Sequence, residues 1–280
     1  MISASRMPHL LGAVRIAIGL LFFQHGAQKL WGFAGGPIDH NFATLHGFAG
    51  PLEVTGGLLI FLGLFTRLCA FILCGEMAVA YFVRWAPHGP LPITNGGELA
   101  VIFCFIYLWL VTAGSGTWSL DYLMRRDTLI QKRTAGRTIA SWEVYARSVL
   151  RVILAFTFSL HGYRGLLGLF PAAAGRPGAV PMALDRLPAL AGGLEIFGGL
   201  LLFAGLFTRL TAAALCVELL AAYLYSAAPR GIWPIGNGGE ETLLYLLVFL
   251  CFAATGGGAW SVDYITGKTR RNPASTVPAL

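Results

Sequence analysis

Two stretches of this chain are nearly identical, and their repetition restricts the possible fold more than any other feature. Residues 57–68 read GLLIFLGLFTRL and residues 199–210 read GLLLFAGLFTRL, so ten of twelve positions agree at an offset of 142 residues. The motif WSLDY at 118–122 returns as WSVDY at 260–264 with the same offset. The chain is therefore a tandem duplication.

The composition is too apolar for a soluble globular protein. The 280 residues are 56% hydrophobic and 12% charged, whereas about a quarter of the residues of a soluble domain are charged. Lipid leaves open backbone groups unsatisfied and no alternating strand pattern appears, so helices are the expected spanning elements. Apolar runs of spanning length occur four times per copy, at 10–32, 50–65, 67–86, 97–113, 145–169, 188–207, 209–227 and 240–255.

We therefore predict an all-α, polytopic membrane protein with eight transmembrane helices arranged as two four-helix bundles. The first repeat covers 1–122 and the second 145–265, with a basic linker at 123–144 and a polar tail at 266–280. An even number of spans per copy makes the copies parallel repeats. A single-copy relative would form a homodimer, so the fusion predicts an internal pseudo-dimer.

Positive charge predicts the orientation. On an eight-span topology, fourteen of the twenty Lys and Arg residues fall on the side of the two termini, the linker and the Thr-Arg turns. The positive-inside rule then makes both termini and the linker cytoplasmic. The net charge of +7 is explained by topology and anionic lipid, and we expect no nucleic-acid partner because no binding motif is present.

Small residues predict which face of the first span of each copy meets protein. They recur every seven positions and occupy matched places in the two copies: Gly12, Gly19, Gly26, Ser148, Ala155 and Gly162. Such a stripe is typical of helix contacts in membranes. Arg15 and Arg151 lie on the same face, so they are expected to point into the bundle.

Buried charges in a membrane need partners. With a rise of about 1.5 Å per residue, Arg15 lies roughly 8 Å and Glu76 roughly 13 Å from the cytoplasmic ends of their spans. An arginine side chain can bridge that difference. We predict the ion pairs Arg15 with Glu76 and Arg151 with Glu218. A pair that fixes helix register and a proton relay are both open readings.

A second polar cluster is expected on the outer side. By the same rise, His25 on the first span lies roughly 22 Å from the cytoplasmic face, and Glu53 and Glu98 begin the descending spans at about 27–29 Å. The candidate outer-side pocket comprises these groups, their counterparts and neighbouring polar residues: His25, Lys29, Glu53, Asn95, Glu98, His161, Glu195, Asn237 and Glu240. Imidazole and carboxylate groups together could handle protons. Alternatively, a carboxylate in the first turn of a helix only complements the macrodipole.

The cysteines and histidines give little sign of redox or metal chemistry. None of the five cysteines forms a CxxC motif, and only Cys74 and Cys216 occupy matched positions. We interpret them as small hydrophobic residues. His25 and His161 have no metal-binding partner one helical turn away, so no metal site is expected.

Several motifs together resemble a known family. The segment HGAQK at 25–29, EVTGG at 53–57, GLFTR at 63–67, NGGE at 95–98 and WSLD at 118–121 are similar to the DoxX family of small bacterial membrane proteins. The second copy resembles it too. The resemblance implies a four-helix protein of the bacterial inner membrane. It also implies a link to redox metabolism, through the DoxD subunit of thiosulfate:quinone oxidoreductase.

The second copy departs from the first at this site. Arg164-Gly165 stands where the first copy has Gln28-Lys29, and Arg230 replaces His88. A site that used the lysine would therefore exist in the first copy only.

Two functions follow as expectations. In the first, the resemblance implies a quinone-associated membrane subunit in which His25, Glu53 and Glu98 handle protons, quinone is the possible cofactor and a separate partner subunit supplies the redox centre. In the second, the chain is a non-enzymatic scaffold or a lipid or small-solute binding protein, and its buried charges only lock the bundle.

Overall fold

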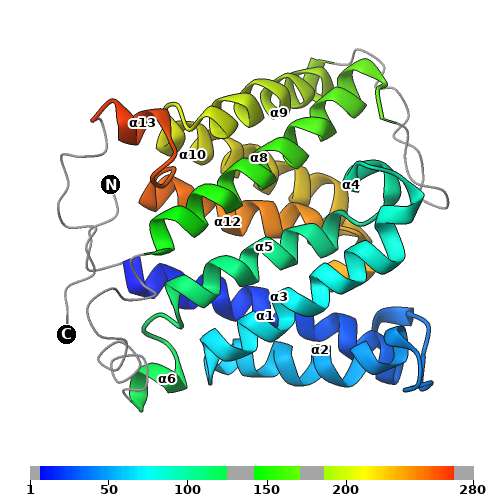
Figure 1. The fold of residues 1–280 in the computed structure, drawn as a ribbon. Coiled ribbons are helices and arrows are strands. Elements are labelled where there is room, and N and C mark those ends of the chain that lie inside the picture. Colours follow the sequence, from blue (N-terminus) through cyan, green and yellow to red (C-terminus); the bar gives the residue numbers. More distant parts are fainter. Residues whose placement is uncertain (1–6, 125–141, 171–185, 268–280) are drawn as a thin grey trace.

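The computed structural model describes residues 7–124, 142–170 and 186–267, and the regular elements within them are helices (Figure 1). Most of the predicted linker 123–144 and of the polar tail 266–280 lies outside the described residues. The all-α prediction is confirmed for the described part of the chain.

Each of the eight predicted spans corresponds to one long helix. The first repeat contains α1 (Met7–Trp31), α2 (Leu45–Leu62), α3 (Thr66–Ala80) and α5 (Glu98–Ala113), and the second contains α8 (Glu143–Leu167), α9 (Arg186–Ala204), α10 (Thr208–Ala222) and α12 (Glu240–Thr255). The connections carry the one-turn helices α4 (Pro92–Asn95), α6 (Leu120–Leu123), α11 (Pro234–Asn237) and α13 (Val262–Ile265).

Five helices in the described residues are long and apolar enough to cross a membrane: Met7–Trp31, Leu45–Leu62, Thr66–His88, Glu143–Leu167 and Thr208–Arg230. The apolar helices Glu98–Ala113 and Leu190–Ala204 are shorter. The chain is thus a multi-pass helical membrane protein, while the count of eight spans stays a prediction.

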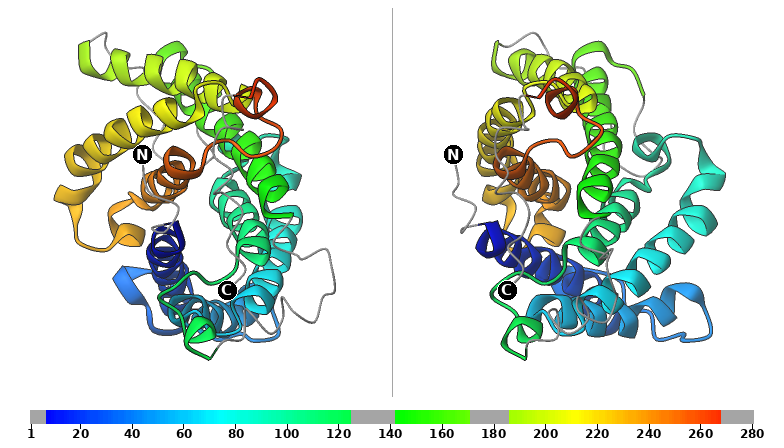
Figure 2. Two further views of the ribbon diagram at one scale, coloured as in Figure 1. Left: turned by 90° about the vertical axis from the view of Figure 1, so that its left-hand side faces the viewer. Right: turned by 60° about the vertical axis from the view of Figure 1, so that its left-hand side comes forward.

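The two repeats are joined along their first and last long helices. Within each repeat, α1 packs on α2 and α3 on α5, as α8 packs on α9 and α10 on α12. Between the repeats, α5 packs on α8 and α1 on α12, an arrangement that can be followed in Figure 2. The repeats therefore share one core, where the sequence suggested two bundles.

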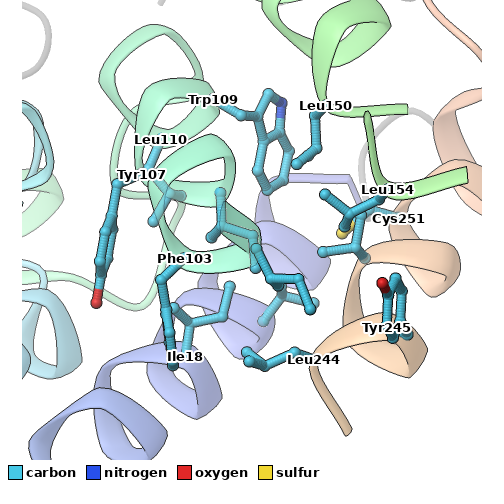
Figure 3. Close-up of a cluster of buried hydrophobic side chains, with 14 of the residues drawn as sticks. Ile18, Phe103, Tyr107, Trp109, Leu110, Leu150, Leu154, Leu244, Tyr245 and Cys251 are labelled. Carbon is cyan, nitrogen blue, oxygen red and sulfur yellow. The ribbon is translucent and has the colours of Figure 1, made fainter. Parts of the chain in front are cut away.

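The shared core is visible in Figure 3, where side chains of both repeats meet. Ile18 of α1, Phe103 of α5, Leu154 of α8 and Leu244 of α12 belong to one buried cluster and are at most 1% exposed. Lipid is as apolar as leucine, so close van der Waals packing, rather than escape from water, holds such helices together.

The predicted stripe of small residues lies at helix contacts. A Cβ atom at Gly26 of α1 would lie 2.5 Å from the backbone nitrogen of Val54 on α2, and one at Gly162 of α8 would lie 2.8 Å from the backbone nitrogen of Ile196 on α9. Only glycine allows backbones this close. The expectation that this face meets protein is confirmed.

Arg15 is fully buried, as expected, but its partners are backbone carbonyls. Its guanidinium donates hydrogen bonds to Phe61 O at 2.5 Å, to Ser115 O at 2.8 Å, and to the carbonyls of Ile60 and Trp118. Ile60 and Phe61 belong to the last turn of α2, whose carbonyls have no partner within the helix. Arg15 thus caps α2 and ties it to the loop after α5.

Arg151 repeats this arrangement in the second repeat. It donates to Gly257 O at 2.8 Å, to Trp260 O at 3.0 Å, and to the carbonyls of Leu202 and Phe203 at the end of α9. The same sequence position therefore has the same structural role twice.

The predicted ion pairs Arg15 with Glu76 and Arg151 with Glu218 are wrong. Both oxygens of Glu76 and one oxygen of Glu218 are buried without a hydrogen-bond partner in the described part of the chain. The negative end of a helix dipole satisfies a cation as a carboxylate would. Helical rise alone could not distinguish these two kinds of partner.

The aspartate of the WSxDY motif holds the start of the third long helix in each repeat. The carboxylate of Asp121 accepts hydrogen bonds from the backbone N–H groups of Phe65 at 2.9 Å and Thr66 at 2.8 Å, at the start of α3. Asp263 does the same for α10. One end of the molecule holds α6, α13 and the first turns of α1, and the opposite end holds α4 (Figure 1).

Candidate functional site

The structure brings six of the nine predicted outer-side residues together in three pairs, and two of these pairs join the repeats. His25 Nε2 lies 2.8 Å from Glu240 Oε1, and His161 Nε2 lies 2.8 Å from Glu98 Oε1. The two glutamate side chains are only 5% and 2% exposed. Each histidine comes from the first helix of one repeat and each glutamate from the last helix of the other.

This exchange corrects the expected grouping, which placed His25 with Glu98 and His161 with Glu240 in the same copy. The contacts of α1 with α12 and of α5 with α8 cross the repeats, so each histidine meets the glutamate of the opposite repeat. Because the repeats are alike in sequence, the sequence cannot tell whether a histidine pairs with the glutamate of its own repeat or of the opposite one. The packing of one repeat on the other decides this.

The asparagines of the NGGE turns hold these glutamates in place. Asn95 donates to Gly89 O at 2.9 Å and accepts from the N–H of Gly97 at 2.8 Å. Asn237 makes the equivalent two bonds. The turn therefore fixes the first residue of the following helix, and in each repeat that residue is the paired glutamate.

The first repeat has a further ion pair, which has no counterpart at the matched positions among the described residues of the second. The ammonium of Lys29 contacts the carboxylate of Glu53, whose side chain is 5% exposed. In the second repeat, Glu195 is half-buried on α9 and Gly165 stands in the place of the lysine. Arg164 donates instead to backbone carbonyls, including Ile93 O at 2.6 Å. The two sites are therefore not equivalent.

The His161–Glu98 pair has two further polar neighbours, which the sequence did not indicate. The hydroxyl of Tyr245 donates to Glu98 Oε1 at 2.6 Å and lies 2.7 Å from Thr157 Oγ1. The matched residues of the first repeat are Phe103 and Leu21. Because the polar residues occur in one copy only, comparison of the copies gave no signal for them.

One cluster in the described residues has the composition of a metal site. Donor atoms of Glu98, His161 and Glu241 lie within 4.8 Å of one another. Two carboxylates and an imidazole can hold a divalent cation such as Zn²⁺ or Mn²⁺. The first repeat has Leu99 at the position of Glu241, so its counterpart lacks the third donor.

A cavity of about 710 Å³ lies in the first repeat, bounded by residues of α1, α2, α3 and α5. Its polar lining includes His25, Lys29, Glu53 and Glu76, and most of the remaining lining is apolar. Such a cavity suits a small amphiphilic ligand, whose polar part needs a few directed partners.

The apolar wall of the cavity continues onto the outer surface of the bundle. Five large apolar lining residues are exposed, on α2, on α3 and in the turn that continues α3: Leu45, Phe48, Ile72, Val79 and Val83. On a membrane-spanning bundle this surface faces acyl chains, so a ligand dissolved in the bilayer could enter directly.

Glu76 is the most unusual residue of the cavity. Both of its carboxyl oxygens are buried, and within the described residues neither has a hydrogen-bond partner. A buried polar group without a partner costs about 1–3 kcal/mol, so native proteins rarely keep one. A polar group of a ligand would satisfy it.

His46, which also lines the cavity, is anchored from outside the helices. Its Nδ1 lies 2.7 Å from Asp39 Oδ2. The backbone N–H of Asn41, together with His46, holds the pKa of Asp39 below its ordinary value. A lowered carboxyl pKa means that this contact persists as the pH falls past the ordinary aspartate range and is lost only below it.

Comparison with known proteins supports the resemblance drawn from the motifs. The DoxX family model matches residues 10–85 and 146–227, one match in each repeat. An uncharacterized protein of Haemophilus influenzae is 41% identical over 120 residues, which are 41% of this chain and 90% of that protein. Its length therefore suits one repeat. No solved structure matches the chain.

Proposed function

This chain belongs to the DoxX family, and from that premise we propose that it binds a quinone in the cavity of its first repeat, as the membrane subunit of a redox system. The bacterial inner membrane is the proposed location, with both termini cytoplasmic. The distribution of Lys and Arg along the chain supports that orientation.

The unpartnered carboxyl group of Glu76 carries this proposal. It lines a cavity whose wall is continuous with the bilayer-facing surface. A ligand that enters from lipid and supplies a polar atom at the depth of Glu76 relieves the cost of its burial. A quinone has an apolar tail and ring and two carbonyl oxygens, so it meets both requirements.

The remaining polar groups of the cavity suit the chemistry of a quinone head group. The carbonyl oxygens accept hydrogen bonds, which the ammonium of Lys29 and the carboxyl of Glu76 can donate when protonated. Phe22 and Phe103 line the same cavity and offer aromatic surface to the ring.

Reduction of a quinone also needs protons. The His25–Glu240 and Lys29–Glu53 pairs combine an acid and a base in contact, and such pairs can pass protons to or from a bound head group. The electrons would come from a separate partner subunit.

Binding of a lipid or small solute without redox chemistry is the second candidate function. The predominantly apolar lining favours it, because an acyl chain fills such a space as well as a quinone tail does. The two candidates differ in the head group: only the first needs carbonyl oxygens opposite Glu76 and Lys29.

Equilibrium binding of decylubiquinone to the purified chain in nanodiscs tests the proposal. Glu76→Leu removes the unpartnered group, and we expect about tenfold weaker binding, which corresponds to about 1.4 kcal/mol. Glu218→Leu changes the matched residue of the second repeat and should leave the affinity unchanged. Equal weakening by both changes would contradict the assignment to the first repeat.

Competition separates the two candidate functions. Decanol carries a tail of the same length without the quinone ring. If decanol displaces decylubiquinone at equal concentration, the cavity selects only a tail and the second candidate is correct. If it does not, recognition depends on the head group, as the quinone proposal requires.

A further inference from the structure

Two cysteines of the first repeat lie in contact although they are far apart in sequence. The Sγ atoms of Cys74 on α3 and Cys104 on α5 are 3.7 Å apart, and Cys104 Sγ also lies 3.5 Å from the carbonyl oxygen of Cys74. Both thiols are half-buried and free. Their thirty-residue separation explains why a search for CxxC motifs did not find them.

Formation of a disulfide requires the two sulfur atoms to approach each other by about 1.7 Å. An S–S bond is about 2.05 Å long and joins residues on closely packed backbones. Helices α3 and α5 make the most extensive helix contact within the first repeat after α1 and α2. Side-chain rotation can therefore close much of the remaining gap between the sulfur atoms.

The pair adjoins the cavity of the proposed quinone. Gly75 and Glu76, which follow Cys74, and Phe103, which precedes Cys104, all line that cavity. Electrons that leave the thiols would thus have only a short path to a ring bound there.

The second repeat provides an internal comparison. Cys216 matches Cys74, but Leu246 stands at the position of Cys104. Among the described residues, the hydrogen-bond partner of Cys216 Sγ is the carbonyl oxygen of Leu246, at 3.7 Å. The second repeat therefore has a lone cysteine where the first has a pair.

We propose that Cys74 and Cys104 form a redox-active dithiol that reduces the quinone in the adjacent cavity. This inference rests on the proposed function. Both S–H bonds break and one S–S bond forms, so the dithiol is oxidised by two electrons. The quinone takes up the two electrons, and the two protons end on its oxygens, which gives one hydroquinone per disulfide.

The test uses the full chain, reduced and purified in nanodiscs, with duroquinone as oxidant. Methyl groups occupy all four ring carbons of duroquinone that carry no carbonyl oxygen, which disfavours simple addition of a thiol. We expect the number of free thiols to fall from five by two per chain, with one hydroquinone formed. Peptide mass spectrometry should find a disulfide between Cys74 and Cys104.

Matched variants identify the residues. Cys74→Ser and Cys104→Ser should each abolish formation of the hydroquinone, whereas Cys216→Ser should leave its yield unchanged. Serine differs from cysteine by one atom, and retained duroquinone binding checks that each variant is folded. Undiminished hydroquinone formation by Cys104→Ser would overturn the inference.

Binding measured in parallel separates this inference from the proposed function. If duroquinone binds to the wild-type chain but no Cys74–Cys104 disulfide forms, the dithiol inference is overturned and the proposed function stands. If duroquinone does not bind, the proposed function fails, and the inference fails with it.

Discussion

Arg15 illustrates how this chain accommodates a charge at membrane depth. Its guanidinium is satisfied by helix-end and loop carbonyls, and the nearby carboxylate of Asp121 interacts favourably with its charge. The sequence correctly indicated that Arg15 is turned inward. It did not reveal the partners, because backbone carbonyls leave no mark in a residue pattern.

A double-mutant cycle tests that arrangement at the level of single residues. Arg15→Ala should lower the free energy of unfolding by about 3–5 kcal/mol, because it leaves buried carbonyls unpaired. Glu76→Leu should raise it by about 1 kcal/mol by removing an unpartnered polar group. The two effects should add to within about 0.5 kcal/mol in mixed-micelle unfolding. A larger coupling would indicate that Arg15 and Glu76 form an ion pair after all.

A second cycle tests the exchange of glutamates between the repeats. His25→Phe and Glu240→Gln should be coupled by at least about 1 kcal/mol, since the two side chains are in contact. His25→Phe and Glu98→Gln serve as the control and should be additive. The reverse pattern in the same unfolding measurement would mean that each repeat builds its own site.

Contacts between the helices depend on small residues. The seven-residue spacing of glycines predicted the contact face of α1 correctly, because sequence spacing determines which residues share a helix face. The cavity between α1, α2, α3 and α5 was not predictable in this way. Its volume depends on how far the helices separate, which periodicity does not encode.

Substitution of a contact glycine should separate α1 from α2. A Cβ atom at Gly19 would clash with the backbone of Phe61, whereas a Cβ atom at Gly193 on α9 would meet nothing within 4 Å. We expect Gly19→Ala to destabilise the protein by at least about 2 kcal/mol, within the range for overpacking.

Gly193→Ala is the control and should be neutral, or stabilising by up to about 1 kcal/mol through helix propensity. Both variants are compared by unfolding in the same micelles. Equal stability of the two would mean that α1 and α2 are not in close backbone contact.

The whole molecule is a pseudo-dimer whose two histidine–glutamate pairs are built across its two repeats. The duplication, the helical class and the family were all readable from the sequence, since they depend on composition and on ordered motifs. The shared core and the crossed pairs were not, because they depend on how one repeat packs on the other.

Separate expression of the repeats tests this assembly. Fragments 1–132 and 133–280, expressed together, should copurify, because α1 contacts α12 and α5 contacts α8. Phe103→Asp should greatly reduce recovery of the complex, as it places a charge in the shared core. Copurification that survives this change undiminished would contradict a common core.

A density map of the purified chain with bound decylubiquinone is the most direct test of the central claim. We expect the quinone ring in the first-repeat cavity, with one carbonyl oxygen within hydrogen-bond distance of Glu76 and the tail directed toward lipid. A ring bound elsewhere, or a cavity filled by an acyl chain at saturating quinone, would contradict it.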